Sequence, residues 1–86
     1  MYYLYVIKSE KDNQLYFGFT GDLKRRFSEH VEGKSFATKG RRPWRLAYYE
    51  AYNSEQDARN REKQLKHYAR AWAILKRRIT RSISNS

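Results

Sequence analysis

The alternation of hydrophobic and polar positions over residues 2–20 predicts a β-hairpin. Residues 2–7 are apolar on both faces of a strand, which is typical of a central strand covered on both sides. The polar residues 8–14 predict a turn, and the aromatic run 15–20 predicts a second strand, antiparallel to the first. Gly18 lies inside that second strand, where glycine weakens the ladder, so it indicates a bulge or the close approach of another group.

The hydrophobic periodicity then changes from that of a strand to that of a helix. Apolar residues at four-residue spacing mark its core-facing stripe: Leu23, Phe27 and Val31. Thr20 or Asp22 can cap the start of this helix, and Gly33 supplies a stop signal. Residues 34–43 are predicted to form a basic loop that is long enough to face a substrate.

The second half of the chain predicts one more strand and two helices. Residues 45–51 have the composition of a strand, and Ser54 with Asp57 forms a capping box before a helix that runs to about His67. A last helix is expected over residues 69–78. Its buried side chains are expected to be Trp72 and either Ile74 or Leu75.

The order of these elements, β-β-α-β-α-α, predicts an α+β fold with a small three-stranded antiparallel sheet and packed helices. With 86 residues the chain has room for one domain, which we place at residues 1–78. The polar residues 79–86 are expected to form a C-terminal tail that frays.

Charge adds a functional expectation to this fold. Nineteen lysines and arginines against nine acidic residues give a formal net charge of +10, which in a small folded domain indicates a polyanionic partner, most often nucleic acid. The absence of cysteine excludes disulfides and thiolate metal sites. No segment has the pattern of a signal peptide or a membrane helix, so we expect a soluble, cytoplasmic protein without a membrane partner.

The charge is unevenly spread along the chain. Residues 33–49 contain five basic residues and no acid, and residues 59–81 contain nine basic residues and one acid, Glu62. Glu62 falls at helical spacing within an apolar stripe, and an acid on the core side of a helix is either paired or functional. The other members of that stripe are Ala58, Leu65 and Ala69.

Four further polar side chains are predicted to approach the same region. Arg26 and His30 share one helical face immediately beside the core-facing stripe. Tyr16 lies on the same face of its strand as Gly18, and Tyr5 comes close to Tyr16 across the hairpin. The chain therefore offers two phenols, a guanidinium, an imidazole and a carboxylate around one concavity.

Two short motifs carry a resemblance to a known family. The segment YLYV contains Tyr5, and eleven residues after that tyrosine the segment YFG begins at Tyr16. Together with Thr20 and the segments DLKRRFSEH and REKQLK, this pair resembles the motifs that name the GIY-YIG nuclease superfamily, over residues 2–72. The chain is most similar to the short, single-domain bacterial members. A better-known relative of these is the N-terminal nuclease domain of the excision-repair incision subunit.

The resemblance implies a role for each candidate residue. Tyr5 and Tyr16 stand for the tyrosines of the two motifs, and Arg26 stands for the arginine that contacts the scissile phosphate. Glu62 matches the glutamate that binds one divalent metal ion, and His30 occupies a position where relatives carry a histidine or tyrosine that assists the nucleophile. The implied function is a Mg²⁺- or Mn²⁺-dependent DNA endonuclease, acting for example on branched or damaged DNA in repair or recombination. The departures from the motifs are Tyr3 in place of glycine and Phe17 in place of isoleucine.

Phosphodiester hydrolysis suits these residue types. It needs an activated water, neutralised phosphoryl oxygens and help for the leaving oxygen. One Mg²⁺ held by a single carboxylate keeps several waters and accepts a substrate oxygen, and an arginine offers a planar, permanently charged fork for phosphate. The proton acceptor is Tyr5, Tyr16 or His30, and the sequence does not choose among them.

Further basic residues are expected to contact phosphates: Lys24, Arg25, Lys34, Lys39, Arg41, Arg42, Arg61, Lys63 and Lys66. Three alternatives stay open at this point. A non-catalytic nucleic-acid-binding module would keep the fold and the basic surface, although it has no need for Glu62. A protein-interaction role would use residues 41–44, RRPW, as an exposed docking loop. Glu62 itself is also a candidate for a structural ion pair with Arg26 or Arg59.

Overall fold

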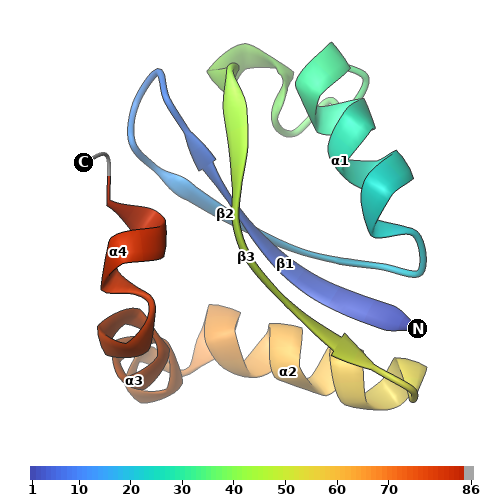
Figure 1. Cartoon of the computed structure of the whole chain (residues 1–86), viewed down its shortest axis with the longest axis vertical. Helices are drawn as coiled ribbons and strands as arrows, with labels where there is room; N and C mark the ends of the chain where they lie inside the picture. Colours follow the sequence, from blue (N-terminus) through green and yellow to red (C-terminus); the bar gives the residue numbers. More distant parts are fainter. Residues whose placement is uncertain (85–86) are drawn as a thin grey trace.

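The computed structural model describes residues 1–84 and contains one sheet with helices on both faces (Figure 1). The strands are β1 (Tyr2–Ser9), β2 (Leu15–Thr20) and β3 (Trp44–Tyr52). The helices are α1 (Leu23–Glu32), α2 (Glu55–His67), α3 (Ala69–Arg78) and α4 (Thr80–Ile83), with a 3-10 turn at Lys39–Arg41. The strands are antiparallel in the order β2-β1-β3, so the predicted α+β fold with a three-stranded antiparallel sheet is confirmed.

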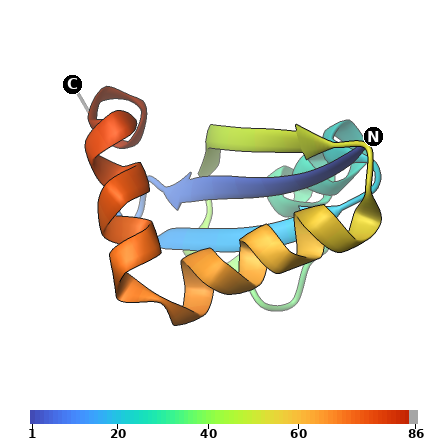
Figure 2. The same cartoon turned by 90° about the horizontal axis from the view of Figure 1, so that it is seen from below.

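β1 is the central strand, as its doubly apolar pattern predicts, and Figure 2 shows it between the other two strands. Leu4 and Val6 belong to the core on one face of the sheet, and Tyr5 and Ile7 belong to the core on the other face. All four side chains are buried. β2 and β3 are the two edge strands, and the candidate site residues described below gather at the β2 edge.

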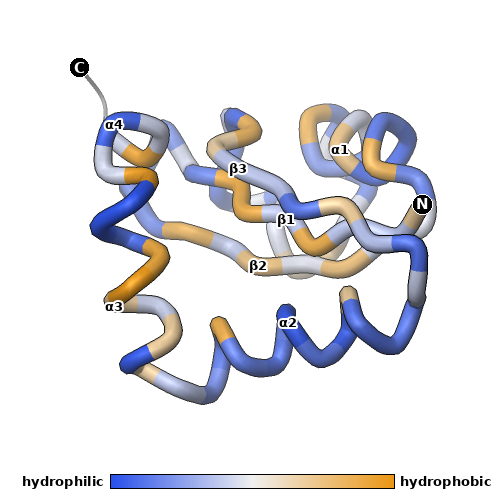
Figure 3. The backbone as a smooth tube through the Cα atoms, turned by 60° about the horizontal axis from the view of Figure 1, so that its bottom comes forward, coloured by the Kyte–Doolittle hydropathy of each residue, from blue (hydrophilic) through white to orange (hydrophobic). Residues whose placement is uncertain are grey.

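Each face of the sheet has its own hydrophobic core. The core against α1 contains Tyr5, Ile7 and Trp44 with Leu23 and Phe27. The core against the C-terminal helices contains Leu4, Val6, Leu65, Leu75 and Ile79. Figure 3 shows that α2 is hydrophilic over most of its length, with its hydrophobic positions on the turns that face the sheet. Only a narrow stripe of α2 is therefore needed for packing, and the rest carries charge.

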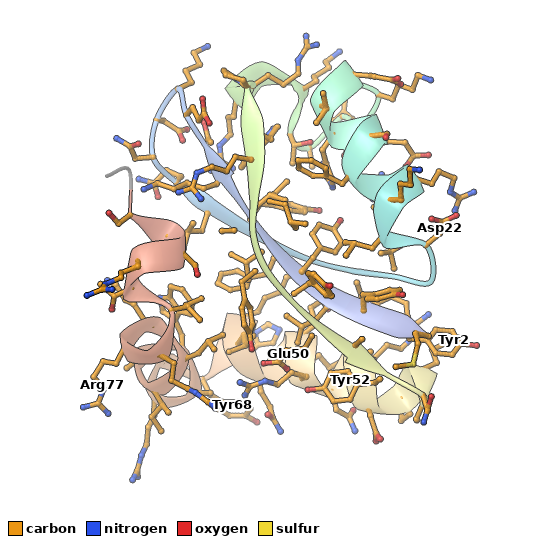
Figure 4. All side chains as sticks on the ribbon, in the orientation of Figure 1. Tyr2, Asp22, Glu50, Tyr52, Tyr68 and Arg77 are labelled. Atoms are coloured by element: carbon orange, nitrogen blue, oxygen red, sulfur yellow. The ribbon has the colours of Figure 1, made fainter. Side chains whose placement is uncertain are left out.

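The helix ends follow from local hydrogen bonding. Asp22, labelled in Figure 4 at the start of α1, accepts a hydrogen bond from the main-chain N–H of Arg25 and is the N-cap. Ser54 accepts a hydrogen bond from the N–H of Asp57 in the same way at the start of α2. Gly33 ends α1 with a φ of 78°, a left-handed conformation that favours glycine.

The buried face of α1 differs from the predicted stripe. Val31, predicted to face the core, is 48% exposed, whereas His30 is fully buried. Successive helical residues are about 100° apart, so a face that includes Leu23, Phe27 and His30 leaves Val31 outside. The helix is rotated so that its polar Arg26–His30 side faces inward, and this rotation brings both residues to the candidate site.

The C-terminal segment is packed, so the expectation of a frayed tail from residue 79 is wrong for its described part. Ile79 belongs to the hydrophobic core, and the four residues after it form α4. Lys8 and Arg45 donate hydrogen bonds to main-chain carbonyls of residues 82–84. These contacts hold the segment against the sheet. Residues 85–86 of the predicted tail lie outside the described residues.

Three side chains lie differently from the expectation or settle an alternative. Leu75 is buried and Ile74 is exposed, which decides between the two candidates in α3. Ala69 is exposed, because α3 begins there and the chain changes direction after α2.

No helix within residues 1–84 has the length and hydrophobicity required to cross a membrane.

The RRPW segment is exposed only in part, at Arg42 and Pro43. Trp44 is only 5% exposed, and its indole Nε1–H donates a hydrogen bond to the carbonyl of Thr38. The guanidinium of Arg41 lies 5.1 Å from the centroid of the Trp44 ring and pairs with Asp12. The segment therefore anchors the connection between α1 and β3 to the sheet.

Candidate active site

The five candidate residues come from four elements that meet at the β2 edge of the sheet. A pocket of about 250 Å³ at this edge includes four of them, all except His30. Its lining residues are Tyr5, Tyr16, Gly18, Phe19, Arg26, Arg59, Glu62 and Lys63. Hollows of about 400 and 550 Å³ elsewhere in the described structure contain none of the five. The candidate site is therefore distinguished by its chemistry and not by its size.

Gly18 allows Tyr5 to reach this pocket. Tyr5 pairs directly with Gly18 across the β1–β2 ladder. An ideal Cβ built on Gly18 would lie 2.2 Å from Cζ of Tyr5, far inside any possible contact. The Tyr5 ring therefore crosses the glycine toward the sheet edge, and the expectation of a close approach at Gly18 is confirmed.

His30 lies behind Tyr5, in the fully buried layer between α1 and the sheet. Its Nε2 is 2.8 Å from the hydroxyl of Tyr5, and its Nδ1 is 2.7 Å from the hydroxyl of Thr38. The edge of the Tyr16 ring also packs against the imidazole, with 5.4 Å between centroids. His30 thus contacts both tyrosines that line the pocket, without lining the pocket itself.

Burial shifts the pKa values of Tyr5 and His30 in the directions that keep both groups neutral. Desolvation raises the pKa of Tyr5 to about 12, against the opposing effect of the Arg26 guanidinium. Desolvation, and after it the positive charge of Arg26, lower the pKa of His30 to about 4, against the smaller opposing effect of Glu29. At neutral pH, Tyr5 is therefore a phenol and His30 a neutral imidazole.

Arg26 is held in a fixed position at the pocket wall. Its Nη1 donates to the carboxylate of Glu29 at 3.0 Å, and its Nη2 donates to the hydroxyl of Ser35 at 3.3 Å. The hydrogen bond from Arg26 lowers the pKa of the Glu29 carboxyl, which stays ionised at neutral pH. A guanidinium that is restrained on two sides loses little conformational entropy when it binds an anion.

Glu62 supplies the only carboxylate among the residues that line this pocket. Its side chain is 19% exposed and pairs with Lys66 at 3.1 Å, one turn further along α2. The ion pair predicted with Arg26 or Arg59 is therefore replaced by one with Lys66. An i,i+4 pair of this kind contributes only a few tenths of a kcal/mol, so it does not explain why an acid is placed beside a basic pocket.

A divalent ion at Glu62 would need ligands other than protein carboxylates. Within residues 1–84 no group of three or more His, Cys, Asp or Glu side chains gathers to form a metal cage. Mg²⁺ does not require one, because it binds through one or two carboxylates together with waters and substrate phosphates. The basic side chains around Glu62 repel a free cation, so the site suits a metal that arrives together with a phosphate.

Two residues of the pocket wall were missed by the sequence analysis. The guanidinium of Arg59 lies 4.6 Å from the centroid of the Phe19 ring and pairs with Glu55. The signal for Arg59 was present in the sequence, because it is three residues before Glu62 and therefore shares its helical face. The sequence gives no such signal for Phe19, because the packing of α2 against β2 brings its ring to the pocket.

The basic residues of α2 that were expected to contact phosphate lie on two different sides of the helix. Lys63 lines the pocket, and Lys66 lies at its rim through the pair with Glu62. Arg61 instead donates two hydrogen bonds to Glu50, a residue of β3 whose side chain points toward α2 (Figure 4). The Glu50 carboxylate also accepts hydrogen bonds from two tyrosine hydroxyls. Arg61 therefore has a structural partner on the side of α2 that faces β3.

The other predicted phosphate ligands belong to α1 and its connection to β3. Arg25 is exposed, and Lys24 lines a separate groove between α1 and β3. Lys34 pairs with Glu32, while Arg42 donates a hydrogen bond to the carbonyl of Lys39. The remaining two residues of this group are Lys39 and Arg41, of which Arg41 pairs with Asp12.

The comparisons with known proteins identify the family of the chain. A family model described as the GIY-YIG catalytic domain matches residues 1–78. The UPF0213 protein of Staphylococcus haemolyticus is 40% identical over 70 residues, covering 80% of this chain and 84% of the relative. The UPF0213 protein of Streptococcus agalactiae is 44% identical over 61 residues, covering 70% and 68% of the two chains.

One solved structure is also similar. The solution NMR structure of the UPF0213 protein of Bacillus halodurans is 34% identical, covers 87% of this chain and 81% of its own, and superposes with a TM-score of 0.54. The chain belongs to the GIY-YIG family, whose members are nucleases that act on nucleic acid. Among them it is similar to the small proteins named UPF0213.

Proposed function

We propose that this protein is a divalent-metal-dependent endonuclease that hydrolyses DNA phosphodiester bonds. The observation that carries the proposal is the meeting of two phenols, a guanidinium and a carboxylate, from four elements, around one pocket of a strongly basic protein. These groups are Tyr5, Tyr16, Arg26 and Glu62. A module that only binds nucleic acid is the alternative, but a carboxylate in its phosphate-binding pocket would weaken binding.

In this proposal Arg26 and Glu62 divide the work on the phosphate. Arg26 binds the scissile phosphate, because its guanidinium is restrained by Glu29 and Ser35 and faces the pocket. Glu62 holds a Mg²⁺ or Mn²⁺ ion. When bound, this ion supplies Lewis-acid stabilisation of the phosphoryl and leaving oxygens. Lys63 and Arg59 contribute positive charge that favours the approach of DNA.

The proton acceptor is Tyr5 or Tyr16, since both line the pocket and His30 does not. Tyr5 is a neutral phenol with a pKa raised to about 12 by burial. It can accept a proton from water only while it passes its own hydroxyl proton on, and Nε2 of His30 is in place for that transfer at 2.8 Å. In this proposal His30 acts through Tyr5, as the acceptor of its hydroxyl proton.

The experiment that tests the proposal is cleavage of supercoiled and branched DNA with Mg²⁺ or with EDTA. We expect Mg²⁺-dependent cleavage that falls by at least about 100-fold in Glu62→Gln, which is typical for loss of a group that stabilises the transition state. The matched control is Asp57→Asn, because it removes the same charge from an exposed position on the same helix. Cleavage that survives Glu62→Gln, or that is lost equally in both variants, would contradict the proposal.

A further inference from the structure

Phe36 lies in the connection between α1 and β3 and is 87% exposed. A phenylalanine left in water gives up the burial free energy that makes this residue type common in cores. Ser35, just before it, is buried, and Thr38, two residues after it, is fully buried. The fold therefore buries these two hydroxyl side chains and leaves the aromatic ring between them outside.

The segment that carries Phe36 is anchored directly to the candidate active site. Ser35 accepts a hydrogen bond from Arg26, and Thr38 contacts Nδ1 of His30 at 2.7 Å. The main-chain N–H groups of Thr38 and Lys39 both donate to the carbonyl of Ser35, which closes a turn around Phe36. The phenyl ring is thus presented on a short, hydrogen-bonded turn whose two ends touch site residues.

The charge around Phe36 suits nucleic acid. The ammonium group of Lys39 lies 5.3 Å from the centroid of the Phe36 ring. Lys34 is two residues away on the other side, where it pairs with Glu32 at the end of α1. No acidic residue occurs between residues 33 and 49. Figure 2 shows the connection between α1 and β3 extending past β2, the strand whose edge carries the candidate site. An aromatic ring flanked by lysines is a surface on which bases stack while the lysines contact phosphates.

We propose that Phe36 stacks on an unpaired base of the DNA next to the phosphate that Arg26 binds. The placement of that phosphate rests on the function proposed above. The inference adds the residue that recognises an unpaired base beside that phosphate, and so narrows the branched or damaged DNA implied by the resemblance to DNA with an unpaired base at the cleavage site. A base inside an intact duplex has both faces covered, so it offers no surface to the ring. Phenylalanine has no hydrogen-bonding group, so the contact selects for unstacked bases and not for sequence.

Binding in EDTA tests this inference without any requirement for catalysis. The two probes are a fully paired duplex and a duplex with a single-stranded flap that carries 2-aminopurine at the first unpaired position. Wild-type protein is expected to bind the flap DNA more tightly and to change the 2-aminopurine fluorescence. Phe36→Ala is expected to lower affinity for the flap DNA by between about 5- and 150-fold, the range for loss of one aromatic–base stack. Affinity for the duplex stays within about two-fold, because phosphate contacts are unchanged.

Two further variants make the result specific. Phe36→Trp is expected to restore flap binding and the fluorescence change, because indole stacks at least as well as phenyl. Tyr68→Ala is the matched control, because Tyr68 is an exposed aromatic at the junction of α2 and α3, away from the site (Figure 4). It is expected to change neither affinity. Circular dichroism checks that each variant is folded.

The inference is overturned if Phe36→Ala lowers affinity for both DNAs equally, if it changes neither, or if wild-type protein binds neither DNA. Its failure can be distinguished from failure of the proposed nuclease function. Metal-dependent cleavage that requires Glu62, combined with unchanged flap preference in Phe36→Ala, removes only the stacking role. Loss of flap preference in Phe36→Ala, combined with no cleavage by any variant, leaves the stacking role and removes the nuclease.

Discussion

The ring of Tyr5 occupies the space in which a side chain on Gly18 would begin. The two residues are directly paired across β1 and β2, and an ideal Cβ on Gly18 would lie 2.2 Å from Cζ of the ring. Tyr5 belongs to the core on the α1 side of the sheet, yet it is also among the residues that line a pocket bordered by α2. Because Gly18 has no side chain, the Tyr5 ring on the α1 face of the sheet can reach a pocket that residues of α2 also line.

Gly18→Ala is therefore expected to destabilise the protein and to disrupt the site. The new methyl group forces either the buried ring or the strand to move, and overpacking of this kind costs about 1–3 kcal/mol in the free energy of unfolding. Urea unfolding measures this cost. Gly40→Ala is the matched control, because a Cβ at Gly40 would have no neighbour within 4 Å.

The double variant shows whether the cost arises from Tyr5. In a Tyr5→Ala background, Gly18→Ala is expected to cost much less, because the atoms that it would overlap are gone. Equal costs of Gly18→Ala in the two backgrounds, or equal effects of Gly18→Ala and Gly40→Ala, would show that the ring does not depend on the glycine.

His30 is expected to make stability depend on pH between about pH 4.5 and 6.5. The pKa of His30 is about 4 in the native protein, and its ordinary value of 6.5 applies to the unfolded chain. Between these values the unfolded chain takes up a proton and the native protein does not. The free energy of unfolding is therefore unaffected by His30 above pH 6.5 and falls as the pH is lowered. The full shift corresponds to roughly 3 kcal/mol.

Urea unfolding at several pH values, on wild type and His30→Gln, measures this dependence. His30→Gln is expected to be less stable at neutral pH but to lose less stability between pH 6.5 and 4.5. His67→Gln removes an exposed histidine and is expected to retain the slope of the wild type. Glu29 and Asp12 have lowered pKa values, so the stability that they contribute is lost below this window. Parallel curves for wild type and His30→Gln would contradict the assignment.

Arg61 and Lys63 are expected to separate stability from DNA binding. Arg61→Ala leaves the largely buried Glu50 without its ion-pair partner, so it is expected to cost about 1–3 kcal/mol in the free energy of unfolding. Lys63 lines the pocket, and Lys63→Ala is expected to reduce DNA affinity and to lower the slope of log K against log salt by about one.

The two variants remove the same charge two residues apart on α2, so each is a control for the other. Arg61→Ala, once folded, is expected to keep the salt dependence of the wild type. Salt titrations of DNA binding, together with urea unfolding, give both quantities. The division of roles is wrong if Arg61→Ala changes the salt slope and Lys63→Ala does not.

The strands and the general position of the site could be predicted from the sequence because they depend on local pattern. The apolar run of residues 2–7 identifies a central strand, and the spacing of Arg26 and His30 places them on one side of a helix. The rotation of α1 about its own axis is not a local property. It depends on which residues the sheet can accept, and the polar partners Tyr5 and Thr38 make His30 acceptable where Val31 was expected.

Long-range partners account for the other differences. Arg61 was expected to bind phosphate because its neighbours in the sequence are basic, but its partner Glu50 lies on β3. Residues 79–84 were expected to fray because they are mostly polar. Their order comes from the burial of Ile79 and from hydrogen bonds donated by Lys8 and Arg45, which are distant in the sequence. None of these pairings produces a periodic signal.

The central claim is that Glu62 holds a divalent ion beside a DNA phosphate, in the pocket that Tyr16 and Arg26 also line. Paramagnetic broadening of amide NMR signals by substoichiometric Mn²⁺ tests it most directly, on wild type and Glu62→Gln, with and without DNA. We predict broadening centred on Glu62, Lys63 and Gly18 that is strengthened by DNA and lost in Glu62→Gln. Broadening centred on another part of the protein, or unchanged in Glu62→Gln, would contradict the account.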